Sequence, residues 1–362
     1  MPDPNRFQTI HEIVKAAQLN LNQTHWDYLV GGTETETTLK RNRSAIDMRA
    51  LNPRVLNDVS KVDTSGTIIG QHLDMPVLLA PIGSVQVFTP EGGAAAAKAA
   101  AEAGIMSIAS SVCEPSLEEI AAASNAPKIY QLYVRGDEKW VDDTVERAID
   151  SGYKGFCLTV DSAVVSRRER DISKRVVPTT AVSVPGDYSY QATLNWSTVE
   201  RIKEKYDIPL IVKGIHRADD AIKAVECGVD VVYISNHGGR QLDQAPGTLD
   251  LLPDIVQAIK GKAEIAIDGG FYRGTDIVKA IAMGADAVGI GRLEAWSLAA
   301  GGAPTLVRCL QILSTEIRIA LILCGVTSFA ELDESFVCAG QAVVQPDVLS
   351  AFPLVDVTDP GY

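Results

Sequence analysis

The chain has 362 residues, of which 46% are hydrophobic and 22% charged, and this composition suits one large globular domain. Its formal net charge of −13 argues against a nucleic-acid partner or an anionic membrane surface. No secretory leader opens the sequence, and no apolar run approaches the ~20 residues that a membrane span needs. The six cysteines are scattered, which predicts reduced thiols and no metal site. We therefore expect a cytoplasmic protein.

The opening segment, residues 1–75, is expected to form a helical cover. Apolar residues recur at helical spacing from Thr9 to Gln23, and a second helical piece runs through Trp26 to the glycine pair at 31 and 32. Tyr28 lies beside that glycine break. It is a candidate for reaching a site from outside, and the alternative is a buried packing aromatic.

From Val77 onward, a unit of one strand and one helix repeats. Alternating elements of this kind predict a parallel sheet, and eight units at this length fit an α/β (β/α)8 TIM barrel. We expect a single domain with a barrel over 76–330 and a tail over 331–362. The expected strands are Val77–Ala80, Met106–Ala109, Lys128–Leu132, Gly155–Val160, Pro209–Val212, Val231–Ile234, Glu264–Ile267 and Ala287–Ile290. The expected helices between them include 92–103, 139–151, 218–227, 249–259 and 276–283.

Each expected strand is followed by residues that can bind a ligand. In a barrel these residues share one face, where active sites of such folds are built. So many polar side chains at one end of apolar strands are costly to bury without a ligand. In chain order they are Pro81; Ser110 and Ser111; Gln131 and Tyr133; Thr159 and Asp161; Lys213; Ser235 and His237; Asp268, Gly269 and Gly270; Gly291 and Arg292.

The last two strand ends indicate what the ligand carries. Glycine-rich turns follow strands seven and eight, at 268–270 and 291–292. Barrels commonly bind phosphate there, on backbone N–H groups and a helix N-terminus. We interpret the pair of turns as a site for a phosphorylated ligand rather than as tight turns alone.

The stretch from Ser235 to Asp243 carries the densest chemistry of the chain. His237 can accept a proton near neutral pH, and Arg240 can hold a carboxylate through two parallel hydrogen bonds. The two intervening glycines would let a flat ligand approach the backbone. The alternative is a polar loop whose histidine caps a helix and whose arginine makes a surface ion pair.

The loop from about 166 to 196 lacks apolar periodicity and contains Pro178 and Pro185. Loops of this length are usually functional covers or mobile segments. We interpret most of its arginines as solvated charges. Arg168 is the exception, because it lies closest to the end of strand four and so to His237.

Taken together, these motifs resemble the FMN-dependent 2-hydroxy acid oxidase and dehydrogenase family, which includes glycolate oxidase, lactate oxidase and mandelate dehydrogenase. The resemblance extends from about Tyr28 to Ala330. The matching motifs are Pro90-Glu91-Gly92, Gln131-Leu132-Tyr133, Leu158-Thr159-Val160-Asp161, Arg167-Arg168, Val212-Lys213-Gly214, the nonapeptide from Ser235 to Asp243, Asp268-Gly269-Gly270 and Ile290-Gly291-Arg292.

The resemblance implies a role for each matching residue. His237 is similar to the base that takes a proton from the substrate, and Asp161 to the carboxylate that stabilises the imidazolium. Lys213 is similar to the lysine beside flavin N1. The implied substrate contacts are Tyr28, Tyr133, Arg168 and Arg240. The implied FMN contacts are Pro81, Ile82, Gly83, Ser110, Gln131, Thr159 and Ser235 at the ring, and Asp268, Gly269, Gly270, Arg273, Gly291 and Arg292 toward the phosphate.

Several positions depart from the family pattern. Ile82 and Gly83 stand where the family usually has threonine or valine and then alanine, under the N5 edge of the flavin. Tyr272 stands where a phosphate-binding arginine is usual, which predicts weaker FMN retention. Val112 and Val165 occupy positions that often shape the substrate pocket. The loop after strand four is shorter than in most members.

We therefore expect FMN-dependent oxidation of an (S)-2-hydroxy acid to a 2-oxo acid, with oxygen or another acceptor reoxidising the flavin. One alternative is a decarboxylating monooxygenase, or a tailoring oxidase acting on a larger 2-hydroxy acid. Others are a non-catalytic binding barrel, and an aldolase-like barrel in which Lys213 forms a Schiff base. Relatives of this kind are often tetramers, so a homo-oligomer without nucleic-acid or membrane partners is expected.

Overall fold

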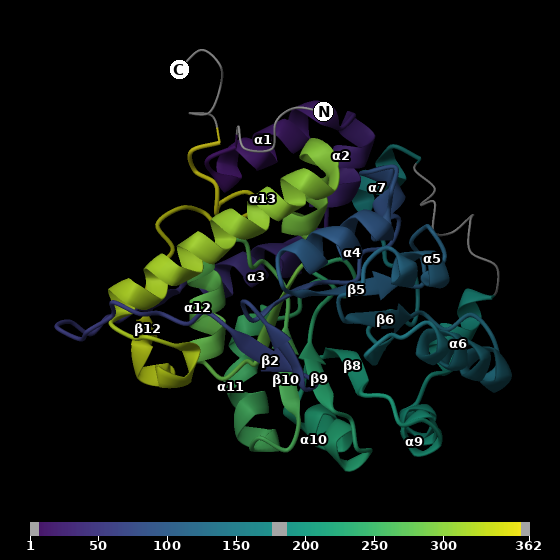
Figure 1. The fold of residues 1–362 in the computed structure, drawn as a ribbon. Helices are drawn as coiled ribbons and strands as arrows, with labels where there is room; N and C mark the ends of the chain where they lie inside the picture. The colour runs from purple at the N-terminus through teal and green to yellow at the C-terminus, as the bar shows by residue number, and fades with distance from the viewer. Residues whose placement is uncertain (1–6, 176–186, 356–362) are drawn as a thin grey trace.

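The computed structural model describes residues 7–175 and 187–355 of the chain. Its centre is a closed barrel of eight parallel strands (Figure 1), which confirms the predicted TIM barrel. All eight expected strands form, within a residue or two of the expected bounds at most ends. The barrel strands are β4 (Val77–Leu79), β5 (Met106–Ser110), β6 (Lys128–Leu132), β7 (Gly155–Thr159), β8 (Leu210–Ile215), β9 (Val231–Ile234), β10 (Glu264–Ile267) and β11 (Ala287–Ile290).

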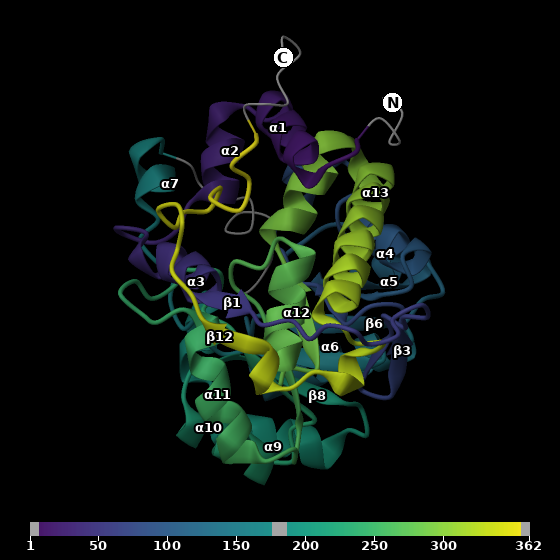
Figure 2. The same cartoon turned by 90° about the vertical axis from the view of Figure 1, so that its left-hand side faces the viewer.

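Helices alternate with these strands and pack around the outside of the barrel (Figures 1 and 2). They are α4 (Gly93–Glu102), α5 (Leu117–Ala122), α6 (Glu138–Asp150), α9 (Trp196–Lys205), α10 (Ala218–Glu226), α11 (Thr248–Ile259), α12 (Gly274–Ala282) and α13 (Arg292–Cys324). The loop after β7 also contains α7 (Glu169–Ser173) and the 3-10 turn η3 (Tyr188–Thr193). Residues 176–186, which include Pro178 and Pro185, lie outside the described part of the chain.

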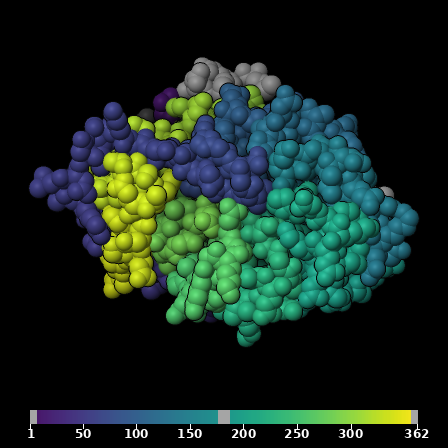
Figure 3. Space-filling view, turned by 60° about the horizontal axis from the view of Figure 1, so that its bottom comes forward, coloured from purple at the N-terminus to yellow at the C-terminus, as the bar shows by residue number. Residues whose placement is uncertain are grey.

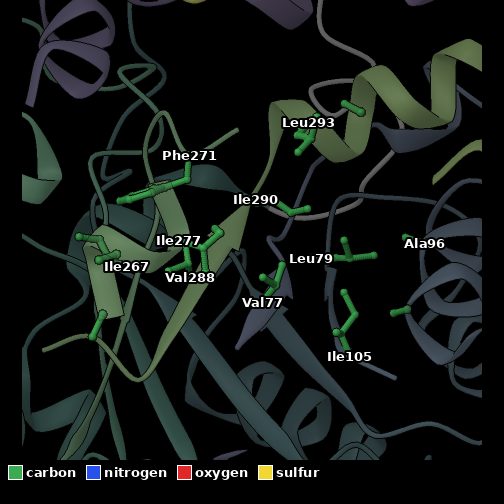
Figure 4. Close-up of a cluster of buried hydrophobic side chains, with 14 of the residues drawn as sticks. Val77, Leu79, Ala96, Ile105, Ile267, Phe271, Ile277, Val288, Ile290 and Leu293 are labelled. Atoms are coloured by element: carbon green, nitrogen blue, oxygen red, sulfur yellow. The ribbon is translucent and has the colours of Figure 1, made fainter. Parts of the chain in front are cut away.

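Alternate residues of each strand pack in two separate hydrophobic clusters, as the twofold periodicity of a strand requires. Leu79 of β4 and Ile290 of β11 face outward to the helices, where Ala96 of α4 is part of the same cluster (Figure 4). Leu78 and Ile211 face inward, into a smaller cluster that fills the barrel. The interior is therefore a packed core rather than a pore.

A short hairpin covers the N-terminal end of the barrel strands. Strands β2 (Gly66–Ile68) and β3 (Gln71–Leu73) pair antiparallel, and Ile68 and Leu73 join the interior cluster. The backbone N–H of Ile69 donates to the Glu264 carboxylate at the start of β10. Because the hairpin covers this end, a ligand site has to lie at the other, C-terminal end of the strands.

From residue 7, where the described part of the chain begins, three helices precede the barrel. The predicted pair forms as α1 (Ile10–Asn20), which packs against α13 (Figure 2), and α2 (Gln23–Val30), which ends at a glycine as expected. The helix α3 (Thr37–Asp47) was not predicted, because much of its buried face is polar: Thr38, Asn42 and Arg43 are all buried. Helices α2 and α3 lie at the C-terminal end of the barrel, where Arg292 donates to the Leu29 carbonyl and Asn42 donates to Asn236.

The last barrel helix, α13, is interrupted at Gly301 and Gly302, whose backbone angles are not helical. The stretch Arg292–Glu331 has the length and apolar composition of a membrane span, but core helices share both properties. More than half of its most apolar window, 56%, is buried inside the protein. We interpret it as a core helix. The expectation that no apolar run approaches the length of a membrane span was nevertheless wrong.

The segment after α13 returns to the N-terminal part of the chain. Strand β12 (Val337–Ala339) pairs antiparallel with β1 (Arg49–Leu51), and Figure 3 shows the yellow C-terminal segment beside the purple-blue one that follows α3. Further on, Phe352 packs against Tyr272 and Trp296, with ring centroids 5.6 Å from each. The tail therefore supports the loop that follows β10.

A buried ion pair joins α3 to the barrel. The Arg43 guanidinium, 4% exposed, contacts both carboxylate oxygens of Asp276 at 2.7 and 3.0 Å and donates to the Gly270 carbonyl at 3.0 Å. Replacing Arg43 with Met would leave the Asp276 carboxylate buried without its cation. We expect the free energy of unfolding, measured by chemical denaturation, to fall by about 3–5 kcal/mol.

The matched control is Arg217→Met. This guanidinium is 72% exposed and pairs with its neighbour Asp219 on the surface. We expect that change to alter the free energy of unfolding by less than about 0.5 kcal/mol. Equal losses in the two variants would contradict a structural role for the buried pair.

Candidate active site

A cavity of about 380 Å³ opens at the C-terminal end of the barrel strands, between the strand-end loops, α2 and the start of α13. Volumes of this size are typical of small-molecule sites. Most of the predicted site residues line it: Tyr28, Pro81, Ile82, Gly83, Tyr133, Arg168, Lys213, His237, Arg240, Asp268, Gly269, Gly270, Gly291 and Arg292.

His237 lies at the centre of the predicted catalytic group. Its Nδ1 is 3.0 Å from Asp161 Oδ1, and its Nε2 is 3.1 Å from the Tyr133 hydroxyl. Because a carboxylate can only accept, Nδ1 carries the proton and donates it to Asp161. The lone pair of Nε2 therefore faces the cavity, on the side of Tyr133.

The environment sets the protonation states of these three groups. Burial lowers the pKa of His237, and the Asp161 charge and hydrogen bond only partly oppose this effect. Burial would raise the pKa of Asp161, but the His237 and Lys213 charges hold it below its usual value. Burial also raises the pKa of Tyr133, which keeps its hydroxyl protonated. The group therefore combines a neutral imidazole, an ionised carboxylate and a phenol donor.

Two arginines face the cavity from different loops. Arg240 Nη1 donates to the carbonyls of Tyr28 at 2.6 Å and Gly31 at 3.0 Å, and its guanidinium lies 4.8 Å from the centre of the Tyr28 ring. Arg168, at the start of α7, donates from Nε to the Arg240 carbonyl at 3.4 Å. Burial, together with the charge of Arg168, lowers the pKa of Arg240. Two neighbouring cations of this kind favour an anionic ligand.

Lys213 lies on the floor of the cavity, 3% exposed. Its Nζ donates to Ser235 Oγ at 2.6 Å and lies 3.2 Å from Asp268 Oδ2. Burial would lower the pKa of this ammonium, but the charges of Asp268 and Asp161 raise it above its usual value. Lys213 therefore presents a permanent positive charge to a ligand bound above it.

The inward side chains at the ends of β5, β6 and β7 are polar and buried. Ser110 donates to Gln131 Oε1 at 2.8 Å, but Gln131 Nε2 and Thr159 Oγ1 have no hydrogen-bond partner among the described residues. Buried polar atoms are nearly always paired in native proteins, so orphaned ones beside a cavity indicate a missing ligand. One amide donor, one hydroxyl and the Lys213 ammonium fit the heteroatoms along the edge of a flavin ring.

The glycine-rich turns form the opposite end of the cavity. Gly269 and Gly270 have φ values of 111° and 87°, and a Cβ at Gly269 would lie 2.7 Å from the Thr248 hydroxyl. Gly291 directly precedes the first turn of α13, whose N-terminal N–H groups can bind a phosphate. Arg292 lines the same region, while its nitrogens donate to the carbonyls of Leu29, Gly31 and Gly238.

Tyr272, which departs from the family pattern, and Arg273, a predicted phosphate contact, lie in different places. Tyr272 lines the cavity, 4% exposed, and its hydroxyl interacts with the Arg292 guanidinium. Arg273 does not line the cavity. Its guanidinium pairs with Glu316 of α13, at 3.1 Å from Nε to Oε2, so it is held away from the glycine turns. Among the described residues, Arg292 is the cation that lines the cavity at this end, while Arg43 lies behind the turn on the Gly270 carbonyl.

The remaining predicted residues lie just behind the cavity wall. Ser110, Gln131, Thr159 and Ser235 are buried, and Asp161 is partly buried. Asp161 contacts His237, Ser235 contacts Lys213, Thr159 pairs with Lys213 in the barrel sheet, and Ser110 contacts Gln131. The predicted pocket-shaping residues Val112 and Val165 both line the cavity.

The lining residues that sequence reasoning missed include Phe88, Arg135 and Tyr188. Phe88 stacks on Tyr28 at 6.2 Å, and the Arg135 guanidinium lies 5.5 Å from the centre of the Tyr188 ring. Arg135 follows Tyr133 by two residues, and side chains two positions apart in an extended segment face the same side. The sequence could therefore have indicated that Arg135 faces the cavity. Tyr188 comes from the long loop after β7, where no sequence periodicity points to the cavity.

Comparisons with known proteins agree with this geometry. The model of a family described as FMN-dependent dehydrogenase matches residues 17–339. An L-lactate oxidase from Nostoc sp. is 39% identical, over 90% of this chain and 97% of the relative. Glycolate oxidase 1 from Zea mays is 36% identical, over 95% of this chain and 98% of its own. A crystal structure of mandelate oxidase with benzoyl-formic acid superposes with a TM-score of 0.86 at 36% identity, covering 93% of this chain and 100% of that one.

Proposed function

Because the chain belongs to the FMN-dependent dehydrogenase family, we propose that it oxidises an (S)-2-hydroxy acid to the 2-oxo acid at the cavity around His237. It is an oxidoreductase acting on CH–OH groups with FMN as its cofactor, as expected from the motifs. The observation that carries the proposal is the pairing of His237 with Asp161 in a cavity that Arg168 and Arg240 also line.

Substrate binding is the task of the two arginines. The substrate carboxylate docks against Arg168 and Arg240, because their two positive charges lie close together in an enclosed site. A guanidinium fork can donate two parallel hydrogen bonds to a carboxylate, which fixes the orientation of the acid as well as its position. The carbinol carbon then faces His237 and Tyr133.

His237 takes one proton from the substrate at Nε2. Asp161 holds the opposite nitrogen and stabilises the positive charge that develops on the ring. The Tyr133 hydroxyl, which lies at hydrogen-bond distance from the same Nε2, can donate to the substrate oxygen. When bound, FMN would accept the two electrons and the second hydrogen that the substrate loses.

Lys213 serves the cofactor rather than the substrate. Its positive charge would stabilise negative charge on a reduced flavin ring, and Ser235 and Asp268 hold the ammonium in place. This pairing does not support the aldolase-like alternative, because a Schiff-base lysine has to lose its proton. The raised pKa of Lys213 opposes that loss.

The test of the reaction is its stoichiometry. Oxygen consumption, hydrogen peroxide and carbon dioxide are measured per molecule of 2-hydroxy acid consumed. One peroxide and one 2-oxo acid per substrate would support the oxidase. Carbon dioxide release with an acid shorter by one carbon would support the decarboxylating monooxygenase instead. The electron acceptor, a homo-oligomeric assembly and a cytoplasmic location stay predictions.

We expect Tyr272 to contribute to retention of FMN through its hydroxyl. The ring is fixed by Trp296 and Phe352, so Tyr272→Phe removes the hydroxyl while keeping the packing. Loss of one hydrogen bond near the phosphate should raise the dissociation constant of FMN by about 2- to 12-fold. Quenching of flavin fluorescence on binding measures this constant.

Riboflavin is the control ligand, because it has the same ring system and no phosphate. Its dissociation constant should be the same for the wild-type protein and for Tyr272→Phe. An equal loss of affinity for both flavins would contradict the assignment of Tyr272 to the phosphate end.

A further inference from the structure

His216 is a second histidine near the catalytic group, and it has no role in the proposed proton transfer or in substrate binding. It follows the last residue of β8, three positions after Lys213, and it is partly buried. Its Nε2 lies 2.6 Å from the carbonyl oxygen of Ser235. Because a carbonyl can only accept, the Nε2 of His216 carries a proton and donates it to Ser235.

Ser235 connects the two sides of the active site. Its hydroxyl oxygen accepts from Lys213 Nζ at 2.6 Å and from the backbone N–H of His237 at 3.1 Å. The residue is fully buried, so water cannot replace either contact. A displacement of Ser235 would therefore move both Lys213 and His237.

The backbone of the base needs such support. His237 has a φ of 59°, in the left-handed region that side chains other than glycine rarely adopt. Conformations of this kind persist only where the surrounding contacts enforce them. The hydrogen bond from the His237 N–H to Ser235 Oγ is one such contact, and His216 holds the other side of Ser235.

The charged groups near His216 are paired with one another rather than with its imidazole. Asp161, from the loop after β7, accepts a hydrogen bond from His237 Nδ1 at 3.0 Å and lies near His216. Lys213 is on β8, the strand that His216 follows, and Asp268 pairs with Lys213 from the end of β10. The next charged pair along the chain, Arg217 with Asp219, is on the exposed surface and engaged with itself.

We propose that His216 is a positioning residue, whose hydrogen bond to the Ser235 carbonyl fixes the Ser235 hydroxyl between Lys213 and His237. The proposal rests on the function assigned above. It requires the donated N–H group and not the size of the ring. It therefore predicts different results for substitutions that keep or remove a donor.

Two variants of the FMN-loaded enzyme separate these possibilities. His216→Gln keeps a side-chain N–H that can reach the Ser235 carbonyl, and His216→Leu keeps volume without a donor. We expect His216→Leu to lower kcat by about 2- to 12-fold, the range for loss of one hydrogen bond, while KM changes little because Arg168 and Arg240 are untouched. The His216→Gln variant should recover most of the loss. Equal losses in both variants, or an unchanged kcat in His216→Leu, would overturn the proposal.

Sulfite provides a readout that needs no substrate. This anion adds reversibly to bound flavin, and a positive charge beside the ring favours the adduct. We expect His216→Leu to weaken sulfite binding several-fold through displacement of Lys213, and His216→Gln to restore it. Unchanged sulfite affinity in His216→Leu would count against the proposal. If no 2-hydroxy acid reduced the wild-type flavin, the proposed function would be wrong. The sulfite affinities of the two variants would still test the role of His216.

Discussion

Replacing His237 with Ala is expected to leave FMN bound and to slow its reduction by a 2-hydroxy acid by 10²- to 10⁴-fold, on the order of the effect of losing a general base. The imidazole contacts Asp161 and Tyr133, whereas Lys213 and the glycine turns provide the flavin site. Stopped-flow absorbance under anaerobic conditions measures the reduction rate directly. An undiminished rate would exclude His237 as the base.

The control for that change is His72→Ala, in the hairpin at the opposite end of the barrel, where the side chain is 68% exposed. The flavin of His72→Ala should be reduced at the wild-type rate.

The pH dependence of the wild-type enzyme provides a second test of His237. His237 accepts a proton only when it is neutral, and burial lowers its pKa below the usual value. For the wild-type enzyme, kcat/KM should therefore hold at neutral pH and fall only below about pH 6.5.

Replacing Arg240 with Met is expected to lower kcat/KM by about 30- to 5000-fold, which corresponds to a loss of about 2–5 kcal/mol for one partner of an enclosed charge pair. The change removes a cation from the carboxylate site and also the hydrogen bonds to Tyr28 and Gly31. Most of the effect should appear in KM. Steady-state kinetics with a series of substrate concentrations separates KM from kcat.

Two further variants interpret that result. Arg240→Lys keeps the charge without the planar fork, so its loss should be intermediate. Arg167→Met alters the neighbouring arginine of the same motif, whose guanidinium is 68% exposed and pairs with Glu169, and it should behave like wild type. A value of kcat/KM for Arg240→Met close to that of Arg167→Met would remove Arg240 from the carboxylate site.

The barrel could be predicted because its strands are short apolar runs buried on both faces, so composition and spacing locate them without tertiary information. Helix α3 could not, since its buried side chains include Asn42 and Arg43, whose partners lie about two hundred residues away. The β2–β3 hairpin was missed for a similar reason. Its strands have three residues each, and their burial depends on the barrel above them.

The candidate site also includes residues that the sequence predicts and residues that it does not. The strand-end residues were predicted because the barrel topology brings every strand end to one face, as it does for Lys213, Ser235 and Asp268. Arg273 was expected to balance a phosphate, but its partner Glu316 is on α13, 43 residues further along the chain. The sequence contains no local sign of that pairing. His216 likewise gained significance only from its distance to the Ser235 carbonyl.

The most direct test of the central claim is an anaerobic titration of the purified, FMN-loaded protein with small and aromatic 2-hydroxy acids, followed by visible absorbance. The account predicts flavin bands that bleach in proportion to the acid added, with the 2-oxo acid as product. Flavin that stays oxidised with every acid, in a protein that binds FMN, would contradict the assignment of this cavity to 2-hydroxy acid oxidation.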